Sequence, residues 1–189
     1  MHSPLVVLSI YFSAIFSPEL ITLFCAFLIA IVIALMLLRK IKPKDVFKQH
    51  ISRGIQSSVL IIGSTVIAIV LVQILKHMFA VPRPEGMLVI EDGFRFPSGH
   101  ATVSTALLFA IILSTNYIYK TWNRSFKYLI TTIALVCWVG VCVSRLILRV
   151  HKPIDIFVGI IVGLLSVGIM FYIYKVLSHD STTQNKNLG

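Results

Sequence analysis

Long apolar stretches alternate with short clusters of charged residues along this chain. A helix rises about 1.5 Å per residue, so stretches of this length suit the roughly 30 Å hydrocarbon core of a bilayer. They occupy residues 19–38, 54–79, 101–118, 128–143 together with Leu146, and 154–174. The pattern predicts an all-α, polytopic membrane helix bundle with five spanning helices.

The first apolar stretch, residues 5–16, is too short to cross a bilayer comfortably. Residues 1–4 carry no positive charge of the kind that precedes the apolar part of a signal peptide. We therefore expect an interfacial or re-entrant helix that ends near Ser17 and Pro18, or a sixth span. At the other end, the polar residues 178–189 are expected to form a disordered tail after a single domain, residues 1–177.

The composition agrees with a membrane protein. Hydrophobic residues make up 57% of the 189 residues, charged residues make up 13%, and the mean hydropathy is +0.92. A soluble domain of this length could not keep so much apolar surface away from water. The cysteines Cys25, Cys137 and Cys142 lie inside apolar stretches, so we interpret them as core residues and not as a disulfide framework or a metal site.

The net charge of +10 arises from basic residues that flank the apolar stretches, so we expect no nucleic-acid partner. Two predicted loops hold most of these cations: Arg39, Lys40, Lys42, Lys44, Lys48 and Arg53 in one, and Lys120, Arg124 and Lys127 in the other. The positive-inside rule places both loops in the cytoplasm. Residues 81–99 and the turn at His151 then face outward. We expect a multi-pass protein of a bacterial inner membrane with its outer loops in the periplasm.

Residues 144–155 read S-R-L-I-L-R-V-H-K-P-I-D and concentrate polar groups between two apolar stretches. His151 and Asp155 are four residues apart, on one face of a helix that Pro153 is suited to begin. An aspartate that accepts from one imidazole nitrogen leaves the other as a nucleophile or base. Arg145 has a planar fork suited to phosphate oxygens. The alternative is a juxtamembrane loop whose charges contact lipid headgroups.

Two further clusters lie on the same side of the predicted topology. Lys76 precedes Arg83-Pro84 by six residues, and Pro97-Ser98-Gly99-His100 begins the next span, where a helix N-terminus favours an anion. Three cations, a hydroxyl and two histidines would together make a phosphoryl-transfer site without a metal or other cofactor. Metal binding by the histidines and Asp155 is the main rival, but the neighbouring cations would repel a divalent ion.

The three clusters together resemble the signature of the type-2 phosphatidic acid phosphatase superfamily. The matching positions are Lys76-x6-Arg83-Pro84, Pro97-Ser98-Gly99-His100 and Ser144-Arg145-x5-His151-x3-Asp155, with no departure from the motif. The resemblance implies that His151 attacks phosphorus to form a phosphohistidine, that Asp155 orients His151, and that His100 protonates the leaving group and then activates water. It also implies a set of phosphate-binding residues, namely Lys76, Arg83, Ser98, Gly99 and Arg145. Similar motifs occur in vanadate-dependent haloperoxidases, which are soluble.

A membrane lipid phosphate is therefore the expected substrate. By resemblance the candidates are undecaprenyl diphosphate, phosphatidylglycerophosphate, phosphatidate and lipid A phosphates, entering sideways from the bilayer. A lipid phosphotransferase with the same phosphohistidine, or a non-enzymatic binder or transporter of phosphate lipids, is an alternative hypothesis. The oligomeric state is open.

Other polar residues have simpler interpretations. Arg95, Arg149 and Lys152 are expected to be solvated rim charges. Glu85, Glu91 and Asp92 are expected to pair with these cations or to shape the loop. Gly159 and Gly163 form a G-x-x-x-G pattern, which we attribute to packing inside the bundle rather than to dimerisation.

Overall fold

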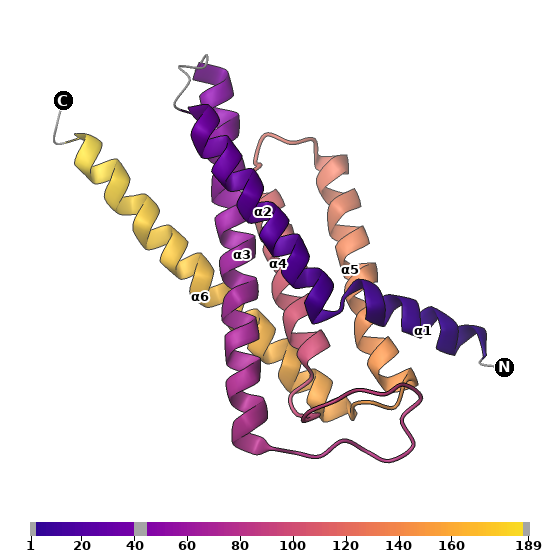
Figure 1. The fold of residues 1–189 in the computed structure, drawn as a ribbon. Helices are drawn as coiled ribbons and strands as arrows, with labels where there is room; N and C mark the ends of the chain where they lie inside the picture. The colour runs from indigo at the N-terminus through magenta and orange to yellow at the C-terminus, as the bar shows by residue number, and fades with distance from the viewer. Residues whose placement is uncertain (1–2, 40–44, 187–189) are drawn as a thin grey trace.

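The computed structural model describes residues 3–39 and 45–186, and this part of the chain forms helices without strands (Figure 1). The helices are α1 (Pro4–Ile15), α2 (Pro18–Arg39), α3 (Asp45–Phe79), α4 (Gly99–Tyr117), α5 (Arg124–Ile147) and α6 (Pro153–Lys186). Five candidate spans are long and apolar enough to cross a membrane. The predicted all-α membrane bundle is confirmed, and the chain is a multi-pass membrane protein.

Local sequence explains where the helices begin. Proline, whose missing N–H costs nothing in the first turn, opens α1, α2 and α6 at Pro4, Pro18 and Pro153. Ser98 caps α4 by accepting from Ala101 N at 3.4 Å. Capping therefore places the start of α4 directly after the Pro97-Ser98 pair.

Several helices run further than the apolar stretches that predicted them. α3 begins at Asp45, and α5 includes Arg124 and Arg145 at its two ends. α6 continues to Lys186, into the segment 178–189 for which we predicted disorder. No proline or glycine interrupts residues 178–186, so the backbone can remain helical although the side chains turn polar. Lys40, Lys42 and Lys44 of the predicted inner loop lie outside the described residues.

Helix α4 occupies the middle of the bundle and is lined with small and hydroxyl-bearing residues. A Cβ added to Gly159 would lie 2.8 Å from Ser98 O, and one added to Gly163 would lie 2.6 Å from Thr102 O. The glycines therefore let the backbones of α4 and α6 approach closely, as small residues do between membrane helices. The prediction that this pattern serves packing inside the bundle is confirmed.

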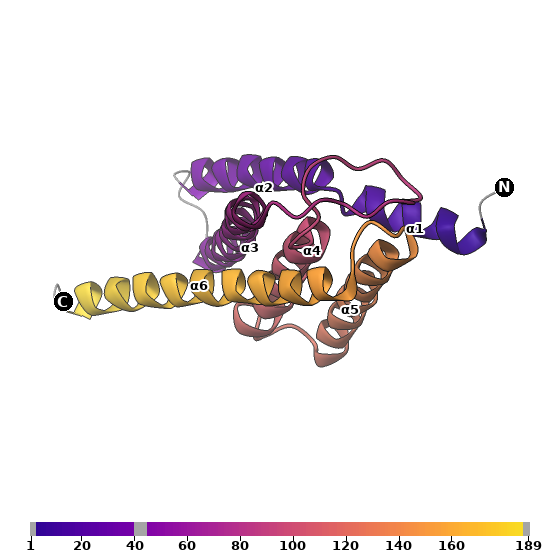
Figure 2. The same cartoon turned by 90° about the horizontal axis from the view of Figure 1, so that it is seen from below.

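The outer surface of the helices is apolar. Leu23 of α2, Val136 of α5 and Phe157 of α6 are each at least 60% exposed. Such side chains would be unfavourable in water and suit a lipid environment. Helix α1 runs obliquely away from α2 instead of continuing along it, and its N-terminal end points away from the bundle (Figures 1 and 2).

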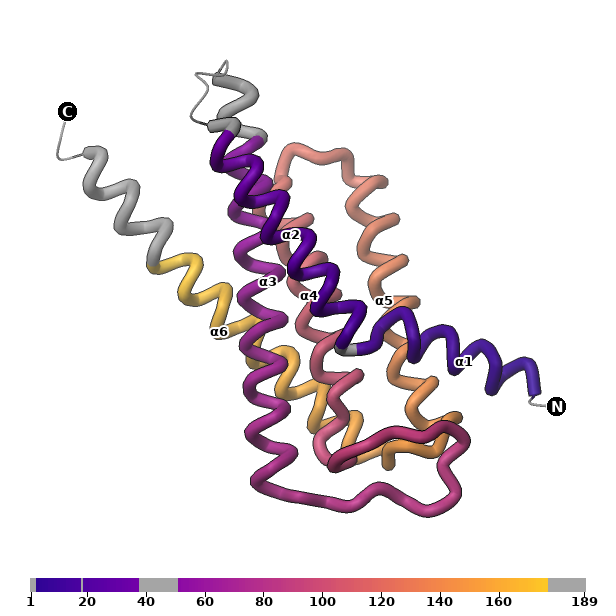
Figure 3. Tube along the Cα trace, viewed as in Figure 1, coloured from indigo at the N-terminus to yellow at the C-terminus, as the bar shows by residue number. Residues whose placement is uncertain are grey.

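The α3–α4 loop, residues 80–98, and the α5–α6 turn, residues 148–152, lie at the same end of the bundle (Figure 3). A backbone hydrogen bond from Leu88 N to Leu148 O at 3.1 Å joins the loop to the turn, and one from Ser98 N to Asp155 O at 3.0 Å joins the loop to the first turn of α6. The three sequence clusters therefore meet at one end of the molecule, as their common side in the predicted topology requires.

Candidate active site

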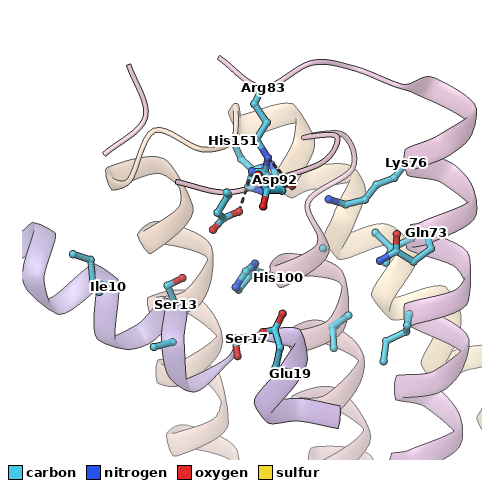
Figure 4. A pocket seen from close by; sticks show the side chains of 16 residues that line it. Ile10, Ser13, Ser17, Glu19, Gln73, Lys76, Arg83, Asp92, His100 and His151 are labelled. Atoms are coloured by element: carbon cyan, nitrogen blue, oxygen red, sulfur yellow. Dashed lines mark hydrogen bonds and ion pairs between the residues drawn. The ribbon is translucent and has the colours of Figure 1, made fainter. Parts of the chain in front are cut away.

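A pocket of about 510 Å³ opens at this end, between α1, the start of α2, α3, α4 and the loop above them (Figure 4). Five of the eight predicted site residues line it: Lys76, Arg83, Gly99, His100 and His151. The other three, Ser98, Arg145 and Asp155, are fully buried or nearly so. Each of these three contacts a pocket residue or adjoins one in the chain. The structure therefore brings all eight predicted residues into one site.

The segment 91–94 of the α3–α4 loop supplies hydrogen-bond acceptors to all three predicted phosphate-binding cations. Lys76 Nζ donates to Phe94 O at 2.6 Å. Arg83 Nε donates to Gly93 O at 3.1 Å, and Nη2 donates to Asp92 O at 3.0 Å. The side chain of Glu91 serves the third cation, Arg145. One short stretch of loop therefore supplies oxygen acceptors to all three cations.

Glu91 joins two of these cations directly. Its Oε1 lies 2.6 Å from Arg145 Nη1, and its Oε2 lies 2.9 Å from Arg83 Nη1. We predicted that Glu91 would pair with Arg95, Arg149 or Lys152, or shape the loop, and the pairing is wrong. The reason is that Arg145 lies in the last turn of α5 and is fully buried, so its charge needs a partner at short range.

Three buried donor or acceptor atoms around the pocket have no hydrogen-bond partner: Arg83 Nη1, Arg145 Nη2 and His151 Nδ1. Arg83 Nη1 is close to the Glu91 carboxylate but lacks hydrogen-bond geometry towards it. Unpaired buried polar atoms are rare in proteins and call for an explanation. A multivalent anion in the pocket would supply the acceptors that the two guanidinium groups lack.

Arg95 is not the solvated rim charge that we predicted. Its Nη1 donates to both carboxylate oxygens of Asp155, at 2.7 and 2.6 Å, and its side chain is only 15% exposed. Asp155 also accepts from Lys152 N at 2.8 Å and is fully buried. Sequence analysis missed this contact because only the folded loop brings Arg95, sixty residues away, to the start of α6.

His151 lies close to Asp155 without a hydrogen bond to it. Its Nδ1 is 3.6 Å from Asp155 Oδ2. Burial, followed by the charges of Arg83, Lys76 and Arg145, lowers the pKa of His151 to about 2. The imidazole is therefore neutral at physiological pH and keeps a lone pair, which a nucleophile requires.

His100 lies at the start of α4 and faces the pocket (Figure 4). Its Nδ1 is 3.4 Å from Arg145 Nη1. Arginine can only donate, so Nδ1 is the acceptor in this contact and the proton of a neutral His100 resides on Nε2. The Nε2–H group of His100 is then a hydrogen-bond donor that does not contact Arg145.

The pocket also includes residues that carried no signal in the sequence. Helix α1 contributes Ser13, the connection between α1 and α2 contributes Ser17, the start of α2 contributes Glu19, and α3 contributes Gln73. An apolar part of the lining is formed by Ile10, Ala14, Ile69, Val72 and Val103. For residues 5–16 we predicted an interfacial or re-entrant helix, or a sixth span, and we named none of these residues for the site. The sequence signal for such a role was the presence of polar residues such as Ser13 and Ser17 in and directly after this apolar stretch.

The sequence of this chain is similar to that of known proteins. The sequence profile of the PAP2 superfamily matches residues 57–178, which include every predicted site residue. Phosphatidylglycerophosphatase B of Haemophilus influenzae is 31% identical over 86 residues, which cover 45% of this chain and 34% of that protein. The alignment thus spans about a third of this relative's length.

Two solved structures share the fold. The crystal structure of a transmembrane PAP2 type phosphatidylglycerolphosphate phosphatase from Bacillus subtilis superposes with a TM-score of 0.63 at 22% identity, covering 95% of this chain and 79% of that one. The crystal structure of Aquifex aeolicus LpxE superposes with a TM-score of 0.56 at 22% identity, covering 91% of this chain and 88% of that one. At these identities the likeness establishes the fold.

Proposed function

The chain belongs to the PAP2 superfamily, and we propose that it is an integral membrane phosphatase that removes a phosphoryl group from a membrane lipid. The observation that carries the proposal is the convergence of Lys76, Arg83 and Arg145 on one pocket that also holds His100 and His151. Cations with unpaired donors suit the charge that develops on a transferring phosphoryl group.

Phosphate binding would use the three cations together with the N-terminus of α4. Backbone N–H groups at a helix start favour an anion, and Gly99 adds no side chain at that point. A Cβ at Gly99 would lie 3.6 Å from Lys76 Cε, beside the ammonium group. Ser98, the cap of α4, holds this backbone in place.

The reaction that we propose has two displacements at phosphorus. In the first, a neutral imidazole nitrogen of His151 forms a P–N bond while the bond to the lipid oxygen breaks, and His100, which enters this step as an imidazolium, gives that oxygen a proton and becomes neutral. In the second, His100 removes a proton from water, which attacks the phosphohistidine and releases inorganic phosphate. Asp155 would hold His151 in orientation and support its positive charge in the intermediate.

Neither a metal nor a cofactor is part of this proposal. In many phosphoryl-transfer enzymes Mg²⁺ neutralises the developing charge on the phosphoryl oxygens. Here Lys76, Arg83 and Arg145 would have that task. Their positive charges would also disfavour a divalent cation in the pocket.

The shape of the pocket supports a lipid substrate. The lining includes apolar side chains on the sides formed by α1 and α3, namely Ile10, Ala14, Ile69 and Val72. A lipid tail could occupy this part while its phosphate lies among the cations. The named relatives include two phosphatidylglycerophosphate phosphatases, and we propose a phosphate of a glycerophospholipid as the substrate class. The basic residues Lys120, Arg124 and Lys127, at the opposite end of the bundle, support a site at the outer face of the membrane.

The proposal is tested by phosphate release from phosphatidate, phosphatidylglycerophosphate and undecaprenyl diphosphate, with purified protein in detergent containing EDTA. We expect hydrolysis of at least one lipid, inhibition by vanadate, and no activity in His151→Ala. Activity that disappears in EDTA and returns with one divalent ion would contradict the metal-free mechanism. Transfer of phosphate to a second lipid, detected by mass spectrometry, would establish a phosphotransferase instead.

A further inference from the structure

The position of Glu91 bears on a problem that any lipid phosphatase faces. Most lipid headgroups in a bilayer carry a phosphodiester, and these anions greatly outnumber a phosphomonoester substrate. We propose that Glu91 makes the site selective for doubly charged phosphomonoesters by occupying it in competition with singly charged phosphodiesters. This inference rests on the proposed lipid phosphatase function.

The geometry shows why Glu91 competes for the site. Its two carboxylate oxygens lie 2.6 Å from Arg145 Nη1 and 2.9 Å from Arg83 Nη1, so one side chain bridges two phosphate-binding cations. The side chains of Arg145 and Arg83 are 0% and 10% exposed, which limits screening of these contacts by water. A lipid phosphate can bind Arg145 Nη1 and Arg83 Nη1 together only after the Glu91 carboxylate has moved away from them.

Charge then decides which anion can displace Glu91. The carboxylate carries one negative charge, and a phosphodiester carries one as well, so their exchange brings no net gain in charge. Glu91 is also tethered to the chain, and its high effective concentration favours it over a free lipid of equal charge. A phosphomonoester carries about −1.5 to −2 charges at pH 7 and has three terminal oxygens. It can therefore replace the carboxylate and satisfy the donors left unpaired on Arg83 and Arg145.

The loop around Glu91 permits this exchange. Gly86 and Gly93 flank it with φ angles of +77° and +73°, and a Cβ added to either glycine would contact nothing within 4 Å. Ile90, its immediate neighbour, is 96% exposed. The segment that carries Glu91 is thus held by contacts with the site cations and by the hydrogen bond from Leu88 N to Leu148 O, none of which belongs to the packing between helices.

A different role for Glu91 predicts the opposite result. If the carboxylate only positions Arg83 and Arg145 for substrate, its removal should weaken the binding of every phosphate or phosphate mimic. If it competes, its removal should strengthen binding, most of all for singly charged lipids. Vanadate and a phosphodiester lipid are suitable probes, since neither requires turnover for its binding to be measured.

The experiment compares the wild-type protein with Glu91→Gln and uses Glu85→Gln as the matched control. Glu85 lies in the same loop, is exposed and does not line the pocket. Phosphatidate hydrolysis is measured in mixed micelles with increasing phosphatidylglycerol, and non-ionic detergent at equal mole fraction corrects for surface dilution. We expect the inhibition constant of phosphatidylglycerol to fall about tenfold or more in Glu91→Gln. It should stay unchanged in Glu85→Gln.

Vanadate binding distinguishes a Glu91 that competes with phosphate from a Glu91 that only positions Arg83 and Arg145. Tighter binding in Glu91→Gln supports competition, whereas weaker binding, or an unchanged inhibition constant for phosphatidylglycerol, overturns the proposal. If the Gln variant unfolds at a lower temperature than wild type, Glu91→Ala is measured in the same way, because the side chain is partly exposed and leaves little cavity. A wild-type protein that neither hydrolyses phosphatidate nor binds vanadate would instead contradict the proposed function itself.

Discussion

Arg95 donates from one nitrogen, Nη1, to both carboxylate oxygens of Asp155, at 2.7 and 2.6 Å. His151 Nδ1 lies 3.6 Å from the same carboxylate. The shortest contacts of the carboxylate are thus with an arginine of the loop and not with the histidine. This pairing ties the α3–α4 loop to the start of α6. The pKa of His151 is low because of burial and the nearby charges of Arg83, Lys76 and Arg145.

Replacing Arg95 by Gln should release Asp155 to His151. Because an unpaired carboxylate favours the protonated imidazole, the pKa of His151 should rise from its low value of about 2. A protonated His151 cannot attack phosphorus, so the acidic limb of the kcat/KM profile should move to higher pH. The profile is measured with p-nitrophenyl phosphate, and the exposed Arg149→Gln is the control. A purely structural role for Arg95 would lower activity equally at all pH values.

The two histidines should differ in their kinetic signatures. His151→Ala should abolish both turnover and any covalent phosphoenzyme. His100→Ala should slow turnover roughly 10²–10⁴-fold, the range for a lost general acid or base. The effect on formation of the phosphoenzyme should shrink with p-nitrophenyl phosphate, whose leaving group needs no proton. Rapid quench with labelled substrate measures this step. A phosphoenzyme that persists in His151→Ala and maps to His100 would reverse the two roles.

The contact between α4 and α6 can be tested with a pair of glycines. Gly163→Ala would place a methyl group 2.6 Å from both Thr102 O and Thr105 Cβ, whereas the same change at Gly168 meets nothing within 4 Å. We expect Gly163→Ala to destabilise the protein by about 1–3 kcal/mol and to lower activity, because the start of α6 also carries Asp155. Gly168→Ala should leave both unchanged. Thermal unfolding in detergent gives the comparison.

The free energy of unfolding should decrease as the pH falls below 6.5, the pKa of an ordinary histidine. The pKa of His151 is lowered on folding from 6.5 to about 2, so the unfolded chain binds a proton over this range that the folded chain does not. The free energy of unfolding then loses up to about 1.4 kcal/mol per pH unit from this group between pH 6.5 and 2. His151→Gln should flatten the dependence of Tm on pH. An identical slope in the variant would exclude His151 as the cause.

Accessibility labelling tests the proposed orientation. In a background without native cysteines, Glu85→Cys and Arg149→Cys should react with an impermeant reagent added to intact cells, because both lie at the end of the bundle that carries the site. Arg124→Cys, at the start of α5 and the opposite end, should be protected. Labelling of Glu85→Cys and Arg149→Cys on opposite sides would rule out a single site.

The sequence alone determined the spanning helices and the residues that gather at the pocket. Apolar length is a local property, and a bilayer demands it of each span separately, so the five stretches could be recognised one by one. The three polar clusters stood out for the same reason, since charge at the edge of an apolar stretch is costly without a partner or task. The apolar stretches did not predict the ends of α3 and α6, because polar residues extend both helices beyond the apolar part.

Only the tertiary structure decided which charges meet. Glu85 and Glu91 look alike in the sequence, as do Arg95 and Arg149, yet Glu91 bridges two site arginines and Arg95 holds Asp155. These pairings depend on where the α3–α4 loop crosses the ends of α5 and α6. The close approach of α4 to α6 at Gly159 and Gly163 contributes by bringing the end of this loop to the start of α6. Electrostatic partners are chosen by distance in space, and no local pattern along the chain encodes that distance.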